Sequence, residues 1–146
     1  MILYLDTSAL VKRYVRESYS DEVVSWWQSA DYLATSFVAY AEALAAFHRK
    51  RREANVPQDL FDRLIGQFRD DWEALIRVEV NAGLEPYVLD LVERHPLRGF
   101  DAIHLASAVA LHERVLQEAN ENLVFACFDE RLIGAARAEG MAVYPG

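Results

Sequence analysis

The sequence predicts an α/β protein with a mainly parallel sheet whose two faces are covered by helices. Short apolar runs typical of strands alternate along the chain with longer stretches of helical periodicity, and this alternation favours right-handed crossovers between parallel strands. The composition, 53% hydrophobic and 26% charged over 146 residues, is that of a globular chain able to bury its own core. We therefore expect a single domain over residues 1–146 with about five strands.

The predicted strands are short, apolar and separated by helical stretches. The first, Ile2–Leu5, is a wholly apolar run that stops at an aspartate, as a buried strand does. Residues 76–80 alternate apolar and charged side chains, which indicates a strand with one less buried face. The predicted strands cover residues 2–5, 32–35, 76–80, 123–127 and 141–144.

The predicted helices follow from composition, periodicity and chain breakers. The segment from about residue 37 to residue 53 is rich in alanine, the best helix former. Pro57 suits the first turn of the next helix, whose apolar residues from Leu60 to Trp72 keep an i, i+3, i+4 spacing. The predicted helices cover residues 7–15, 21–28, 37–53, 57–72, 86–94, 100–119 and 129–138.

The chain carries no sequence signal for export or for a membrane. Its single cysteine, Cys127, excludes an intramolecular disulfide and fits a reducing compartment. The N-terminal segment Met1–Asp6 lacks the basic region and the small-residue cleavage site of a signal peptide, and no run of roughly 18 apolar residues is free of charge. We expect a cytoplasmic protein without a membrane span.

The net charge of −8 weakens the case for a nucleic-acid partner, because affinity for nucleic acids comes mainly from Lys and Arg neutralising phosphates. A local basic patch, or metal ions in an acidic cleft, can overcome this repulsion. Basic residues at a helix C-terminus are favoured by the helix dipole, so their default interpretation is a solvent-exposed cap. The candidate contacts for RNA or a partner protein are Lys12 and Arg13 in one cluster and Arg49, Lys50, Arg51 and Arg52 in the other.

Three aspartates stand at the ends of predicted elements. Asp6 and Asp129 each follow a strand directly, and Asp101 opens a helix. The carboxyl ends of parallel strands are where functional groups gather in open α/β sheets. The alternative interpretation of each aspartate is an N-terminal cap, which accepts backbone N–H bonds at the start of a helix. The two roles are compatible.

Glu42 lies inside the predicted helix 37–53, where capping cannot explain it. Its neighbours at helical spacing are Val38, Ala39, Ala45 and Ala46, so the face around it is small and apolar. An unpaired ionised carboxylate on such a face would be expensive to bury. The side chain therefore needs a partner, a raised pKa or a cation, unless it faces solvent.

A divalent cation would allow these carboxylates to share a pocket. Two unit charges about 4 Å apart repel by ~4 kcal/mol at an effective dielectric of about 20, and Mg²⁺ and Mn²⁺ prefer oxygen ligands. Such an ion can also activate a water and neutralise the charge that develops on a phosphodiester. His104, on the same helix face as Asp101, is expected to be packed and hydrogen-bonded. The candidate catalytic and metal-binding residues are Asp6, Glu42, Asp101 and Asp129.

Four segments of the chain match, in order, the motifs of one known family. They are Leu5-Asp-Thr-Ser-Ala-Leu10, Tyr40-Ala-Glu-Ala-Leu44, Phe100-Asp-Ala-Ile-His-Leu-Ala106 and Phe128-Asp-Glu-Arg-Leu132, followed by Ala135, Ala136 and Gly140. Over essentially its whole length the chain resembles the PIN-domain family, and within it the VapC-like toxins of toxin–antitoxin pairs.

The resemblance implies a three-layer α/β/α sandwich that hydrolyses RNA with Mg²⁺ or Mn²⁺. It implies as metal ligands Asp6, Glu42, Asp101 and, often through water or a second ion, Asp129. Thr7 or Ser8 would support the site by hydrogen bonding. The implied partners are a cognate antitoxin, docking near the acidic cleft, and a second copy of the chain. Cys127 is a departure, since the family often has Thr or Ser at that position.

Two other interpretations remain open. Aspartate-nucleophile phosphatases and dehalogenases also begin with a strand followed by Asp, but they usually place a second Asp where this chain has Ser8. Alternatively the fold is a non-catalytic binding module in which the acids are structural caps. The position of Glu42 argues against that module.

Overall fold

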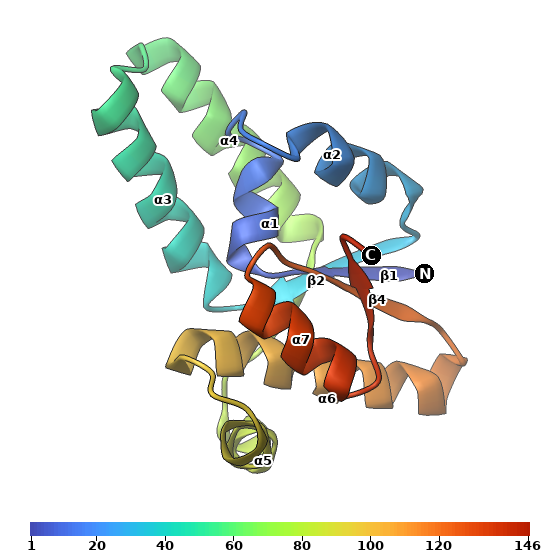
Figure 1. Cartoon of the computed structure of the whole chain (residues 1–146). Coiled ribbons are helices and arrows are strands. Elements are labelled where there is room, and N and C mark those ends of the chain that lie inside the picture. Colours follow the sequence, from blue (N-terminus) through green and yellow to red (C-terminus); the bar gives the residue numbers. More distant parts are fainter.

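Five parallel strands form the central sheet, in the order β3-β2-β1-β4-β5 (Figure 1). The computed structural model describes residues 1–146. The predicted α/β class is confirmed, and the sheet is parallel at every pairing. The strands are β1 (Ile2–Leu5), β2 (Tyr32–Ser36), β3 (Ile76–Val78), β4 (Leu123–Ala126) and β5 (Ala142–Tyr144).

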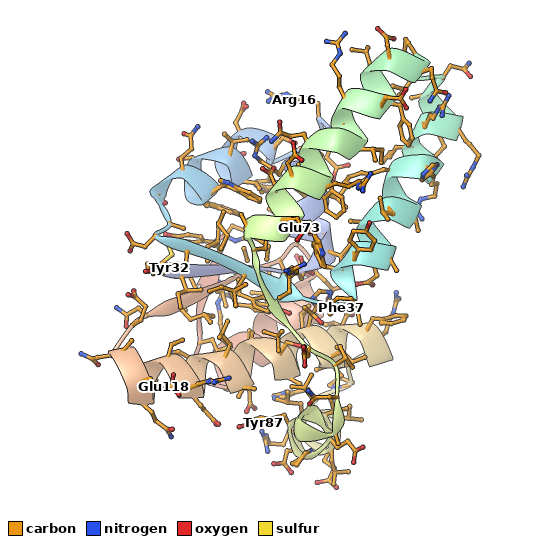
Figure 2. The ribbon with its side chains drawn as sticks, turned by 180° about the vertical axis from the view of Figure 1, so that it is seen from behind. Arg16, Tyr32, Phe37, Glu73, Tyr87 and Glu118 are labelled. Atoms are coloured by element: carbon orange, nitrogen blue, oxygen red, sulfur yellow. The ribbon has the colours of Figure 1, made fainter.

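Helices cover both faces of the sheet, which confirms the three-layer arrangement (Figure 1). One face carries α1 (Thr7–Lys12), α2 (Ser20–Ser29), α3 (Ala39–Ala54) and α4 (Gln58–Ala74). The other face carries α5 (Glu85–Arg94), α6 (Gly99–Ala119) and α7 (Glu130–Ala138), with the short 3₁₀ turn η1 (Ala82–Leu84) before α5. Figure 2, seen from behind, shows α3 and α4 as an antiparallel pair beyond one end of the strands, with α5 outside α6.

The residues of β1 alternate between the two halves of the core. Leu3 and Leu5 pack with the helices α1 to α4, and Ile2 and Tyr4 pack with α5, α6 and α7. All four side chains are buried, as expected for the central strand of a parallel sheet covered on both faces. None of the helices is both long and apolar enough to cross a bilayer.

The strand order reverses direction at β1. From β1 the chain proceeds to β2 and then β3 on one side, and it returns over the opposite face, through α5 and α6, to β4 on the other side of β1. A crevice opens at such a switch point, outside the carboxyl ends of the two strands, and ligands bind there in open α/β sheets. Asp6 and Asp129 follow β1 and β4, so both lie at this switch point.

Several predicted boundaries were wrong by a few residues. The first helix ends at Lys12 instead of Val15. The N–H of the next residue, Arg13, bonds to the carbonyl of Leu10, only three residues back, as at the end of a helix. β3 ends at Val78 instead of Val80, because its neighbour β2 ends at Ser36, the residue in register with Val78.

The helix that carries Glu42 begins later than predicted. It starts at Ala39, after the cap residue Val38, so Glu42 lies in the first turn of α3 and not in the helix interior. A carboxylate in the first turn of a helix is favoured by the helix dipole.

Candidate active site

A cleft of about 670 Å³ opens at the carboxyl ends of β1 and β4. Acidic side chains reach it from four segments far apart in the sequence: the end of β1, the first turns of α3 and α6, and the start of α7. The structure brings together in this cleft all of the predicted acids, Asp6, Glu42, Asp101 and Asp129.

Asp6 is the most buried of these acids, with 5% of its surface exposed. Its Oδ1 accepts hydrogen bonds from the Ala9 N–H at 2.9 Å and the Ser8 hydroxyl at 2.7 Å, so it caps α1. These bonds leave Oδ2 without a partner in the chain. Burial raises the pKa of Asp6 from 3.8 to about 6, although the bonds from Ser8 and Ala9 act in the opposite direction.

Asp129 also caps a helix and is joined to Asp6 through Ser8. Its Oδ1 accepts the Leu132 N–H at 3.0 Å, and its side chain is otherwise exposed. The Ser8 hydroxyl, which donates to Asp6, accepts the N–H of Phe128, the residue before Asp129, at 3.2 Å. The capping interpretation therefore holds for Asp6 and Asp129, and each keeps one carboxylate oxygen free.

The buried thiol of Cys127 lies 3.8 Å from the backbone carbonyl of Asp129, not from its carboxylate. Burial raises the pKa of this thiol, and the charge of Asp6 raises it further. Cys127 is therefore a protonated, inert side chain at neutral pH. Neither Cys127 nor Ser8 bonds the Asp129 carboxylate, whose one hydrogen bond within the chain comes from the Leu132 N–H.

Glu42 finds a partner in His104, as its burial requires. Its Oε1 accepts bonds from the Thr7 hydroxyl at 2.5 Å and from His104 Nε2 at 3.0 Å. Burial raises the pKa of Glu42, but the bonds from His104 and Thr7 outweigh it, so the net pKa is lowered. Glu42 is therefore held ionised, with its second oxygen free of hydrogen bonds from the chain.

His104 is itself held in place by a contact with Tyr4. The two side chains are buried, and the Tyr4 hydroxyl lies 3.0 Å from His104 Nδ1. Burial raises the pKa of Tyr4 well above its usual value, so the phenol keeps its proton and can donate to Nδ1. His104 Nε2 then carries the proton that points to Glu42. The predicted packed histidine is thus a link between the core and the cleft.

Asp101 caps no helix, so that alternative interpretation was wrong. The helix α6 begins at Gly99 with Arg98 as its cap residue, and Asp101 lies in the first turn. Burial raises the pKa of Asp101, and the charge of Asp129 raises it further. Its carboxylate forms no salt bridge, and the nearby His104 and Arg98 only partly offset this rise in pKa.

The acids fit a hard divalent cation in their chemistry. Each has at least one oxygen that no group of the chain occupies. The charge of Asp101 raises the pKa of Asp6, and the charge of Asp129 raises the pKa of Asp101. No three His, Cys, Asp or Glu side chains stand close enough together to enclose an ion directly. The residue types are therefore those of a cation site. Their side chains lie further apart than they would around a bound ion.

Basic residues line the same cleft and partly offset the charge of its acids. They are Lys12, Arg49, Lys50 and Arg98. Arg98 was not predicted as a contact, and neither was Glu17, which pairs with Lys12 at 3.0 Å and Lys50 at 3.7 Å. No sequence pattern identifies Glu17, because its pairing with Lys50 depends on the packing of α1 against α3.

The other predicted basic contacts lie outside the cleft. The Arg13 guanidinium stacks over the rings of Tyr14 and Trp27. Arg51 stacks over Phe61, and with Arg52 it lines a separate hollow at the far end of α3. Their side chains are therefore not placed to contact anything bound at the acids.

Replacing His104 by Ala is expected to lower the free energy of unfolding by about 2–4 kcal/mol. The substitution opens a cavity and leaves the buried Tyr4 hydroxyl without its partner. Tyr4→Phe in the His104→Ala background should then cost much less than Tyr4→Phe in the wild type, with a coupling energy of about 1 kcal/mol or more. Urea unfolding of the four proteins measures this cycle, and additive effects would show that the two side chains do not act together.

The chain is similar to known proteins over nearly its whole length. The PIN domain family matches residues 3–137. Among curated proteins, Ribonuclease VapC45 of Mycobacterium tuberculosis (strain CDC 1551 / Oshkosh) is 33% identical over 144 residues, covering 99% of this chain and 95% of that protein. Ribonuclease VapC46 of M. tuberculosis (strain ATCC 25618 / H37Rv) is 32% identical over 142 residues, covering 97% and 95%.

Solved structures share the fold at low sequence identity. VapBC2 from Rickettsia felis, bound to a DNA fragment from their promoter, aligns with a TM-score of 0.64 and 12% identity over 98% of this chain and 97% of that chain. VapBC-1 from nontypeable Haemophilus influenzae aligns with a TM-score of 0.61 and 16% identity over 98% and 96%. At these identities the likeness concerns the fold.

Proposed function

The chain belongs to the PIN-domain family, and from this membership we propose that it is a metal-dependent endoribonuclease that hydrolyses RNA phosphodiester bonds. We propose further that it is the toxin of a toxin–antitoxin pair. The relatives named as ribonucleases cover nearly the whole chain. The observation that carries the proposal is the gathering of four carboxylates, from four separate segments, in one cleft at the switch point of the sheet.

The cleft has the charge pattern that phosphodiester hydrolysis requires. Asp6, Glu42, Asp101 and Asp129 would hold Mg²⁺ or Mn²⁺ through oxygens that the chain leaves free. When bound, the cation supplies a Lewis acid that lowers the pKa of a water and offsets charge on the scissile phosphate. Ser8 and Thr7 fix the orientation of Asp6 and Glu42 through their hydroxyl groups.

The basic residues of the cleft would hold the phosphates that flank the scissile bond. Lys12 and Lys50 approach the cleft from α1 and α3, and Arg98 from the start of α6. Glu17 pairs with both lysines, so phosphates bound there would compete with its carboxylate. Charge-assisted contacts of this kind bind a phosphate without reading its base.

We propose two protein partners, a cognate antitoxin and a second copy of the chain. The antitoxin is supported by the solved structures of similar fold, which are VapBC pairs. The dimer is supported by apolar side chains on the outside of α5, where Leu89 is 61% and Val92 47% exposed. Sedimentation of the purified chain tests the dimer, and a mass of one subunit at micromolar concentration would contradict it.

Purified protein should cut a defined, end-labelled RNA with Mg²⁺ or Mn²⁺ and should not cut it with EDTA. The same ions at about 100-fold excess over their Kd should raise the melting temperature of the wild type by roughly 5–10 °C, because a ligand that binds only the folded chain stabilises it by ~2.7 kcal/mol at that excess. Asp101→Asn should show neither effect.

The two readouts separate the competing interpretations. Folded, antitoxin-free protein that binds the ion but cuts no RNA would be a binding module. Hydrolysis of a phosphate monoester, with RNA left intact, would favour an aspartate-dependent phosphatase. A melting temperature that no divalent ion changes would remove the metal from the proposal.

A further inference from the structure

Tyr19 has an unusual backbone conformation for a bulky residue. Its φ of 70° and ψ of 6° place it in the left-handed region, at the cap position before α2. The only other non-glycine residues with positive φ are Asn55 and Asn120, which end helices, where asparagine is well tolerated. A tyrosine in this conformation is strained, and such strain often marks a functional position.

The strain at Tyr19 is not explained by burial of its ring. The side chain is 52% exposed, and it belongs to neither of the two apolar clusters that form the core. Buried aromatic residues such as Phe47 and Phe68 fill the interior instead. The fold therefore holds an aromatic ring at the surface in a conformation that costs free energy.

The ring of Tyr19 lies beside the candidate active site. Its centroid is 5.2 Å from that of Phe128, the residue before Asp129, and Phe128 lines the cleft. Phe128 stacks in turn on Trp26 at 5.9 Å, and Trp26 stacks on Tyr144 at 4.8 Å. We call these rings the aromatic row. Its inner members are partly buried and pack on the core, so they support Tyr19 as a rigid base.

A cation stands where the aromatic row meets the cleft. Lys12 Nζ lies 4.7 Å from the centroid of the Phe128 ring and 3.0 Å from Glu17. The exposed Tyr19 ring thus lies against the Phe128 ring, which lines the cleft together with the positive charge of Lys12. Aromatic faces next to basic side chains bind single-stranded nucleic acids, in which bases stack on the rings while the phosphates meet the cations.

We propose that Tyr19, supported by Phe128, stacks against an unpaired base of the RNA next to the phosphate that lies at the acids. The proposal rests on the proposed function, since it places the base beside the site of cleavage. The ligand is an unpaired base, because bases within a duplex have their faces covered by their neighbours. Stacking of this kind tolerates any base, so it selects single strands and not a sequence.

Tyr19→Gly tests the proposal without endangering the fold, since glycine adopts positive φ freely. Binding of a labelled single-stranded RNA is measured by fluorescence anisotropy in EDTA, so that no RNA is cut. Tyr19→Gly should bind about tenfold more weakly than the wild type. Tyr19→Phe, which keeps the ring, should bind as the wild type does. Tyr32→Ala is the matched control. Tyr32 is exposed to a similar extent, 58%, but it lies at the start of β2, the end of that strand away from the cleft (Figure 2).

A duplex of the same sequence completes the design. Its binding should be the same for the wild type and Tyr19→Gly, and an equal loss on duplex and single strand would overturn the stacking proposal. So would wild-type affinity in Tyr19→Gly, or a loss in Tyr19→Phe equal to that in Tyr19→Gly. Cleavage is assayed separately with Mg²⁺ or Mn²⁺. If the wild type cuts RNA and Tyr19→Gly binds RNA normally, only the stacking proposal is overturned. If binding depends on Tyr19 but the wild type cuts no RNA, only the proposed ribonuclease activity is contradicted.

Discussion

Asp6→Asn is expected to reduce RNA cleavage by at least about 100-fold while making the metal-free protein more stable. A cation held at the acids, as proposed, would contribute several kcal/mol to transition-state stabilisation, and each 1.36 kcal/mol corresponds to a factor of ten in rate. Asparagine keeps the shape of the side chain and an oxygen that can accept the bonds from Ser8 and Ala9. It removes the charge that would hold the cation.

The gain in stability follows from the pKa of Asp6, which burial raises from 3.8 to about 6. Between these values the folded chain keeps a proton that the unfolded chain has lost, so the stability of the wild type falls as pH rises through this window. The fall amounts to at most about 3 kcal/mol, at 1.36 kcal/mol for each pKa unit. At pH values above both pKa values, the ionised Asp6 destabilises the metal-free folded protein.

Urea unfolding in EDTA between about pH 4 and pH 7.5 measures this effect. The difference in stability between Asp6→Asn and the wild type should grow as pH rises, since only the wild type ionises at Asp6. Asp70→Asn, an exposed aspartate of α4, is the control and should follow the wild type. A mutant that is less stable than the wild type at pH 7.5, or one that still cuts RNA at the wild-type rate, would refute the assignment of Asp6.

Phe68→Ala should lower the free energy of unfolding by about 3–5 kcal/mol. The Phe68 ring is fully buried, and it contacts Phe47 at 5.2 Å, Tyr14 at 5.4 Å and Trp72 at 5.8 Å between ring centroids. The contact with Phe47 joins α4 to α3, the helix that carries Glu42, and the contact with Tyr14 joins α4 to the segment after α1. A loss of this size is a large part of the 5–15 kcal/mol by which domains are usually stable.

Urea unfolding again provides the measurement, with Leu60→Ala as the control on the same helix. Leu60 is 49% exposed, so its substitution should change stability by less than about 1 kcal/mol. Equal effects of the two substitutions would show that the aromatic cluster does not anchor α4.

The sequence was sufficient to predict the order and type of the main elements, because each has a clear period and a clear end. Ile2–Leu5 stops at an aspartate, and the alanine-rich segment forms α3. The turn η1 was not predicted, since its cap depends on a single bond from the Gly83 N–H to the Asn81 side chain. The ends of β3 and α1 were wrong because neighbouring elements, and not local propensity, determine them.

The acids of the site could be named from the sequence, but their surroundings could not. The positions of Asp6 and Asp129 follow from the rule that parallel strands share a carboxyl edge. His104 lies 62 residues from Glu42, and no pattern in the chain indicates that they are bonded. The strained backbone of Tyr19 is equally invisible in the sequence, since a tyrosine is an improbable residue for positive φ.

The position of β4 beside β1 has a consequence for the synthesis of the chain. β1 is made before β4, yet its residues pair with Leu123–Ala126, 121 residues further along the chain. Such distant contacts close slowly, and β1 keeps an open edge until they form. Asp129 leaves the ribosome later still. If the chain is the ribonuclease proposed above, a copy interrupted before β4 and Asp129 would lack a complete site, and it is expected to leave the RNA around its ribosome uncut.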